Sequence, residues 1–241
     1  MILILVSISC ASFKSNEFGD IDVQFEKAKS FLDKKKYLRA QEEFNNLVIR
    51  GTHTDLGDDS QFYLAESYFL NKEYLLAISE YDRLIRRMGF SPYVEKARWR
   101  VCESYVKESP KYYKDQRNTQ KALSKLQEFI DDYPNSDYKN EANAQISELR
   151  TKLAYKEYAT GILYIKMEEY PSAIISFEYL IDNYYDTEVL EKGHIEIIRC
   201  YILMDDLKKA ENHYNNHSSE IFNDDLKKTA LKYINKANSS N

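Results

Sequence analysis

A set of small and aromatic residues returns every 37 residues along this 241-residue chain. The first two copies have the same spacing throughout: Ala28, Phe31, Tyr37, Ala40, Phe44 and Leu47, then Ala65, Tyr68, Tyr74, Ala77, Tyr81 and Leu84. Two more copies lie near the C-terminus: Gly161, Tyr164, Tyr170, Ala173, Phe177 and Leu180, then the looser Ile198, Tyr201, Leu207, Ala210 and Tyr214. An internal repeat of this length indicates a stack of similar supersecondary units.

A third copy lies between these pairs and is interrupted by an insertion. It begins in register at Cys102 and Tyr105, and its second half arrives eight residues late, after a loop around Ser109 and Asp115. The late residues are Ala122, Leu126 and Phe129. The chain therefore contains five repeats.

Each copy has the spacing of a helical hairpin. In the first helix, a small residue three positions before an aromatic lets the partner helix approach. In the second helix, another small residue, four positions before another aromatic, receives it. The pattern resembles the tetratricopeptide family, whose signature is matched by Gly161 with Tyr164 and by Ala173 with Phe177. The resemblance covers residues 20 to 217. It implies an all-α fold, a superhelical solenoid of five hairpins, because single hairpins cannot bury their own apolar faces.

Composition supports helices and argues against several classes of function. Six Gly and four Pro leave few tight turns for a β fold, whereas 21 Tyr and 11 Phe supply large side chains for helix packing. The net charge of -5 argues against a broad basic surface, so we expect no nucleic-acid partner. The sequence has no Gly-rich phosphate loop, Gly-x-Ser-x-Gly elbow, His-Glu-x-x-His helix or Cys-x-x-Cys pair. We therefore expect no enzyme, no catalytic residue and no cofactor.

The first nine residues, MILILVSIS, predict a secretion signal. They form an apolar run too short to span a bilayer, and a polar stretch follows Cys10. Ser9 is small enough for signal peptidase, so Ser7-Ile8-Ser9-Cys10 resembles a bacterial lipobox and Cys10 is the predicted site of lipid attachment. Several acyl chains would anchor the protein almost permanently. The alternative is a buried N-terminal strand.

Two other cysteines and a pair of histidines are less informative. Cys102 and Cys200 fall at apolar positions of first helices in different repeats, so we expect two small buried hydrophobic residues.

His213 and His217 lie four residues apart with Glu211 nearby, but zinc needs a third and a fourth ligand. The sequence predicts a solvated helix face there and no metal.

The concave side of the predicted stack is the candidate peptide-binding surface. In each first helix, the positions three before, one after and four after the small residue lie off the packed stripe. In the first three repeats, the candidate groove residues at these positions are Phe25, Lys29, Phe62, Glu66, Phe69, Trp99 and Glu103, accompanied by Leu32 and Val106. Phe25, Phe62 and Trp99 would form an aromatic ladder suited to an extended apolar or aromatic peptide. The alternative, weighed equally, is that these aromatics pack between adjacent first helices.

A long helix is predicted between the third and fourth repeats. Apolar residues recur there at helical spacing, and Pro134 and Ser136 mark the boundary with the preceding helix. The predicted organisation is a signal peptide (1–9), a tether (10–19), an N-terminal module of repeats 1 to 3 (20–135), a connecting helix (136–160), a C-terminal module of repeats 4 and 5 (161–235) and a tail (236–241).

Four features together resemble the BamD family of lipoproteins of the outer-membrane β-barrel assembly complex. They are the lipobox-like N-terminus, the five repeats, the insertion in the third, and a run from Tyr133 to Glu157. In that run, Tyr133-Pro134-Asn135-Ser136-Asp137-Tyr138 leads into Leu149-Arg150 and Leu153-Ala154-Tyr155-Lys156-Glu157.

This resemblance implies a lipid-anchored protein on the periplasmic face of the cell outer membrane. Its N-terminal repeats would receive unfolded outer-membrane protein clients, and its C-terminal repeats would grip a BamA-like barrel protein. Ala11 and Ser12 follow the cysteine in place of an inner-membrane retention Asp, which is compatible with outer-membrane sorting. A periplasmic adaptor that coordinates other cell-envelope or export proteins is the alternative function.

Overall fold

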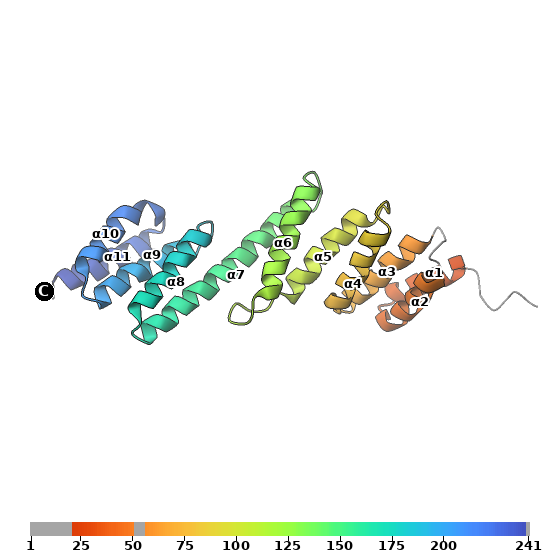
Figure 1. Cartoon of the computed structure of the whole chain (residues 1–241), viewed down its shortest axis with the longest axis horizontal. Coiled ribbons are helices and arrows are strands. Elements are labelled where there is room, and N and C mark those ends of the chain that lie inside the picture. Colours follow the sequence, from red (N-terminus) through yellow and green to blue (C-terminus); the bar gives the residue numbers. More distant parts are fainter. Residues whose placement is uncertain (1–20, 51–55, 240–241) are drawn as a thin grey trace, which may run out of the picture. The chain divides into compact units, whose positions relative to one another are not determined.

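The repeats fold as helical hairpins, as a computed structural model of residues 21–50 and 56–239 shows (Figure 1). The bounds are α1 Ile21–Asp33, α2 Tyr37–Arg50, α3 Gly57–Leu70, α4 Tyr74–Arg87, α5 Val94–Glu108, α6 Arg117–Asp132, α7 Lys139–Lys166, α8 Tyr170–Asn183, α9 Leu190–Leu203, α10 Leu207–His217 and α11 Asp224–Asn238. A short 3-10 turn, η1 Ser218–Glu220, lies between α10 and α11. No strand occurs within these two ranges. The predicted all-α solenoid of hairpins is confirmed, whereas the signal, Cys10 and the tether lie outside the described residues.

The chain forms two compact units, residues 1–104 and 105–241. In the first unit, α1 packs on α2, α3 on α4, and α2 on α3. The repeat residues form its core, since Ala28, Ala40, Phe44, Leu47, Ala65, Ala77, Tyr81 and Leu84 are all buried. Residues that recur every 37 positions are therefore the ones that pack between neighbouring helices.

The second unit contains α6 to α11. Helix α7 packs on both α6 and α8, α9 packs on α8 and α10, and α11 packs on α9. Helix α7 is continuous over 28 residues, so the predicted connecting helix and the first helix of the fourth repeat are one element. The division into modules 20–135 and 161–235 stays a prediction, because the boundary between the compact units falls within α5.

Helix α11 follows the five hairpins and buries Ala230 and Ile234 against the last one. The side chain of Asn223 caps its N-terminus by accepting hydrogen bonds from the backbone N–H groups of Asp225 and Leu226. The helix continues to Asn238, so residues 236–238 of the predicted tail are helical. A terminal helix of this kind covers the last apolar face of a repeat stack.

Four interhelical turns share one backbone conformation, again at the repeat interval. Lys35, Lys72, Glu168 and Asp205 have φ angles of 56°, 64°, 62° and 60°. At the second turn, the N–H of Lys72 bonds to the carbonyl of Phe69 and the N–H of Glu73 to that of Tyr68. This left-handed cap satisfies the last carbonyls of the first helix and turns the chain into the second.

The two other cysteines, Cys102 and Cys200, are buried in α5 and α9. Their predicted role as small buried residues is confirmed.

Candidate binding surface

The three aromatic residues of the predicted ladder are buried. Phe25, Phe62 and Trp99 are 6%, 1% and 3% exposed. The ring of Phe62 stacks on Tyr93, just before α5, with centroids 4.4 Å apart and planes 13° apart. Phe25 contacts Tyr63 edge to face, with ring centroids 5.7 Å apart. These contacts agree with the packing alternative, in which the aromatics join neighbouring helices.

Two polar members of the predicted groove, Glu66 and Glu103, meet around a residue that the sequence did not single out, Arg100 in α5. Its Nε donates to Glu66 Oε1 at 2.7 Å and its Nη2 to Glu66 Oε2 at 3.1 Å, which makes a two-point contact. Its Nη1 donates to Glu103 Oε2 at 2.8 Å. The hydroxyl of Tyr81 donates to the same Glu66 Oε1 at 2.5 Å. One network therefore joins α3, α4 and α5.

Burial and charge act in opposite directions on this network. Burial disfavours the charge of Arg100, but the carboxylates of Glu66 and Glu103 outweigh this and raise the pKa of its guanidinium. Burial, and then the neighbouring Glu66, raise the pKa of Tyr81 well above its usual value, so its hydroxyl stays a hydrogen-bond donor. Two carboxylates face one guanidinium, which leaves the network with a net negative charge.

Apolar and cationic groups border the network on the first helices. The guanidinium carbon of Arg100 lies 4.5 Å from the ring centroid of Phe69, a cation–π contact on a half-buried aromatic. In α1, the ammonium of Lys29 lies 5.7 Å from the Phe25 ring and 5.6 Å from the Tyr63 ring. This arrangement can accept hydrogen bonds, stack on a planar group and contact an apolar side chain.

A second candidate surface lies at the end of the last hairpin. Leu203 and Met204 are exposed where α9 ends. Beside them is a hollow of about 350 Å³ between α9 and α11, lined by Leu203, Tyr233 and Lys236 among others. Its lining is largely apolar and carries both cationic and acidic side chains, which suits a protein partner better than a small polar molecule.

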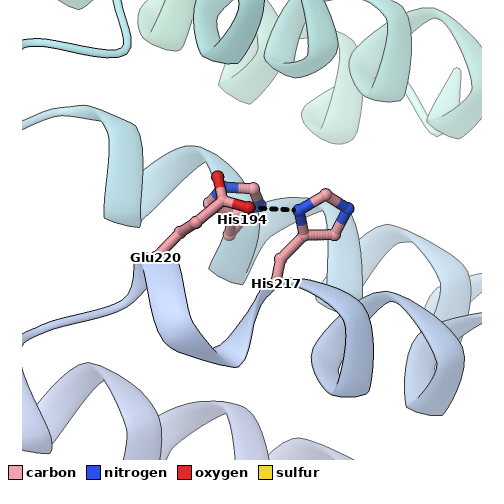
Figure 2. Close-up of side chains that lie close together, drawn as sticks. All are labelled: His194, His217 and Glu220. Carbon is pink, nitrogen blue, oxygen red and sulfur yellow. Dashed lines mark hydrogen bonds and ion pairs between the residues drawn. The ribbon is translucent and has the colours of Figure 1, made fainter.

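The sequence predicted that His213 and His217 lie on a solvated helix face. In the structure they lie close together in α10 and are half-buried. The structure brings two more groups to them, His194 from α9 and Glu220 from η1 (Figure 2). Among the described residues, His194, His217 and Glu220 form the only cluster of three or more histidine, cysteine or acidic side chains whose ligand atoms are close enough together that they could hold a metal ion. The sequence does not reveal the arrangement, because His194 and Glu220 are brought in by tertiary contacts and not by local spacing.

With this geometry in view, comparison with known proteins decides the family. The model of the YfiO family, described as outer membrane lipoproteins, matches residues 20–216, which is most of the chain. The chain belongs to the YfiO family. The resemblance to BamD-type lipoproteins, carried by the repeats, the insertion and the run through Glu157, is thereby confirmed.

Two relatives of this YfiO-family chain carry the name outer membrane protein assembly factor BamD. The one from Rickettsia prowazekii is 26% identical over 214 residues, covering 87% of this chain and 85% of the relative. The one from Caulobacter vibrioides is 26% identical over 112 residues, covering 46% of this chain and only 37% of the relative. This chain therefore spans well under half of the Caulobacter protein.

Solved structures similar to this YfiO-family chain include tetratricopeptide proteins. The TPR2AB-domain:pHSP90 complex of yeast Sti1 has a TM-score of 0.46 at 15% identity and covers 91% of this chain and 83% of that one. TTC0263 of Thermus thermophilus has a TM-score of 0.37 at 15% identity, with coverages of 89% and 99%. At these TM-scores the likeness carries no argument about function. Within the described residues, no helix is both long and apolar enough to cross a membrane.

Proposed function

We propose that this protein is a lipid-anchored scaffold subunit of the machinery that assembles β-barrel proteins in the outer membrane. The match of the YfiO family model over residues 20–216 is the observation that carries this proposal. The stacked hairpins add a physical basis, because they display side chains along extended surfaces and so favour binding over catalysis. A lipid on Cys10 would hold the scaffold at the periplasmic face of the membrane.

The two candidate surfaces would bind different partners. The surface around Arg100 and Phe69 would hold unfolded barrel precursors, whose extended chains present unpaired backbone groups and alternating aromatic side chains. The exposed Leu203 and Met204, with the adjacent hollow, would hold the periplasmic domain of a BamA-like barrel protein. The charged residues of the precursor surface would be Lys29, Glu66 and Glu103. The buried rings of Phe25, Phe62 and Trp99 would pack beneath it and hold its helices in place.

The partner is tested by purifying the protein from a detergent-solubilised envelope. A large barrel protein with periplasmic repeats should accompany it. Leu203→Glu places a charge at the edge of the hollow and should reduce the recovered partner at least tenfold. Leu75→Glu, at another exposed leucine, in α4, is the control and should leave recovery unchanged. Recovery of only export or peptidoglycan-linked proteins would favour the adaptor function instead.

The precursor surface needs a variant that leaves the core intact. Truncating the buried Phe62 or Trp99 would remove about 3–5 kcal/mol of packing energy and so confuse folding with binding. Phe69→Ala removes a half-buried ring and should weaken binding of a fluorescent C-terminal β-barrel peptide about tenfold, with helical circular dichroism unchanged. Tyr113→Ala, at an exposed aromatic of the second unit, is the control. An unaltered dissociation constant for Phe69→Ala would remove this surface from the proposal.

A further inference from the structure

Three of the chain's four histidines meet in the second compact unit, together with one carboxylate. His194 lies in α9, His213 and His217 in α10, and Glu220 in η1. The His194 and His217 rings are stacked with centroids 4.8 Å apart, and those of His213 and His217 are 4.6 Å apart. Figure 2 shows His194, His217 and Glu220 turned toward one another.

The local fold explains why Glu220 joins the histidines. Helix α10 ends at His217 and the chain tightens into η1, which returns Glu220 to the helix end. Its Oε1 lies 2.9 Å from His217 Nδ1, and its Oε2 lies 3.3 Å from His194 Nε2. The carboxylate therefore bridges the two imidazoles. Glu211, the acidic residue near the pair in sequence, lies elsewhere and accepts a hydrogen bond from Asn238.

The hydrogen bonds of His194 leave one ring nitrogen unpartnered. His194 is fully buried, at 0% exposure, and its Nδ1 is hydrogen-bonded to His213 Nε2 at 3.1 Å. Its Nε2 is buried and lacks a hydrogen bond of acceptable geometry, although Glu220 Oε2 is only 3.3 Å away. When Nδ1 carries the ring proton, the lone pair on Nε2 faces a carboxylate oxygen. Two acceptors in that position repel each other unless a proton or a metal ion lies between them.

We propose that His194, His217 and Glu220 bind a zinc-class divalent transition-metal ion, with His213 orienting His194 through its hydrogen bond to Nδ1. Two imidazoles and one carboxylate are a ligand set that zinc accepts, whereas magnesium and calcium require mostly oxygen ligands. A histidine ligand usually has its second ring nitrogen held by another polar group, which is the role of His213. Water would complete the fourth coordination position.

The ligand atoms lie near one another but are more widely spaced than a bound ion requires. With zinc–ligand bonds near 2.0–2.1 Å, neighbouring ligand atoms of a tetrahedral site lie about 3.3 Å apart. One ligand atom from each of the three residues can be chosen such that all lie within 4.8 Å of one another. His217 and Glu220 keep 36% and 44% of their side-chain surface exposed, so they can move inward and admit the ion.

The protonation states also suit coordination. Burial, and then the neighbouring histidines, lower the pKa of His213 to about 4. Burial and His217 lower that of His194, while the hydrogen bond from His217 lowers that of Glu220. A neutral imidazole at His194 and an ionised carboxylate at Glu220 are the forms that bind metal. A bound ion would tie α9 to the end of α10 and so brace the hairpin that carries Leu203.

The test is zinc titration of the chelator-treated full-length protein by calorimetry, with bound metal quantified after desalting. The wild type should bind one zinc ion per chain, and zinc should raise its melting temperature, whereas magnesium should do neither. His217→Ala and Glu220→Gln should weaken zinc binding more than tenfold. Glu211→Gln and His53→Ala, a nearby carboxylate and the remaining histidine, are the matched controls and should bind as the wild type does.

Cobalt provides a second readout that does not depend on stability. Co²⁺ should give the intense visible absorption of a tetrahedral site in the wild type and lose it in His217→Ala. His194 is fully buried, so its replacement would also disturb the fold and is not used. The proposal is overturned if the wild type retains no zinc, if His217→Ala and Glu220→Gln bind as tightly as the wild type, or if only His53→Ala abolishes binding. Those results would leave an uncoordinated histidine cluster that braces the hairpin by packing.

Discussion

At the scale of single residues, the close packing of Phe177 in the second unit depends on Gly161. It is the small residue of the fourth repeat, and it lies under the ring of Phe177. A Cβ atom at this position would lie 2.5 Å from two carbons of that ring. Phe177 is fully buried, so its ring has no space into which it can move. The equivalent position is Ala in the first two repeats.

Gly161→Ala is therefore expected to destabilise the second unit by about 1–3 kcal/mol through overpacking. This outcome opposes helix propensity, which alone favours Ala over Gly by up to about 1 kcal/mol in a helix interior. Urea unfolding followed by circular dichroism measures the difference. Gly89→Ala is the control, because a Cβ there would lie 3.9 Å from its nearest neighbour. A stabilised Gly161→Ala protein would show that α7 and α8 can separate freely.

At the scale of helices, the first unit is held together by charge as well as by its apolar core. Arg100 lies between Glu66 and Glu103, and only 10% of the Glu66 side-chain surface is exposed. A buried charge that loses its partner is strongly destabilising, whereas a paired surface charge contributes little. Loss of the Arg100 charge should therefore loosen the packing of α3, α4 and α5 more than loss of one hydrogen bond would.

Arg100→Met should lower the free energy of unfolding by about 2–4 kcal/mol, since it leaves Glu66 buried without a counter-charge. Adding Glu66→Gln to this variant should recover much of the loss, because the amide can still accept the Tyr81 hydrogen bond without carrying a charge. Arg117→Met is the control, because the Arg117–Asp115 pair is 84% and 60% exposed and should change stability by less than about 0.5 kcal/mol. If Arg100→Met behaves like Arg117→Met in urea unfolding, the network is not structural.

The helices were largely predictable from the sequence, and the sites were not. Core packing depends on local spacing, so the pattern of small and aromatic residues located the hairpins and their buried faces. The repeat pattern does not include Tyr93, so it could not predict that this ring stacks on Phe62 and covers it. Arg100 left only a weak signal, an opposite charge three residues before Glu103. The partners of His194 come from a neighbouring helix and a 3-10 turn that has no counterpart in the repeat.

At the scale of the whole molecule, the two proposed protein-binding surfaces belong to different compact units. Phe69 and Arg100 lie in residues 1–104, and Leu203 and the histidine cluster lie in residues 105–241. Changes at sites that share no interacting residues have nearly additive effects. Precursor binding and partner binding should therefore respond to separate variants, and a metal ion at His194 should influence the second surface rather than the first.

The predicted attachment to the membrane depends on Cys10, which lies outside the described residues. The lipobox-like Ser7-Ile8-Ser9-Cys10 predicts acylation of Cys10, and several acyl chains make a protein partition strongly into detergent or lipid. Cys10→Ser should move the purified protein from the detergent phase to the aqueous phase in a phase-separation assay. Purified protein is required because a bound barrel partner would hold an unlipidated chain at the membrane. Cys102→Ala, which removes a buried thiol of α5, should stay in the detergent phase. If processed Cys10→Ser protein also stays there, the anchor is not a lipid on this cysteine.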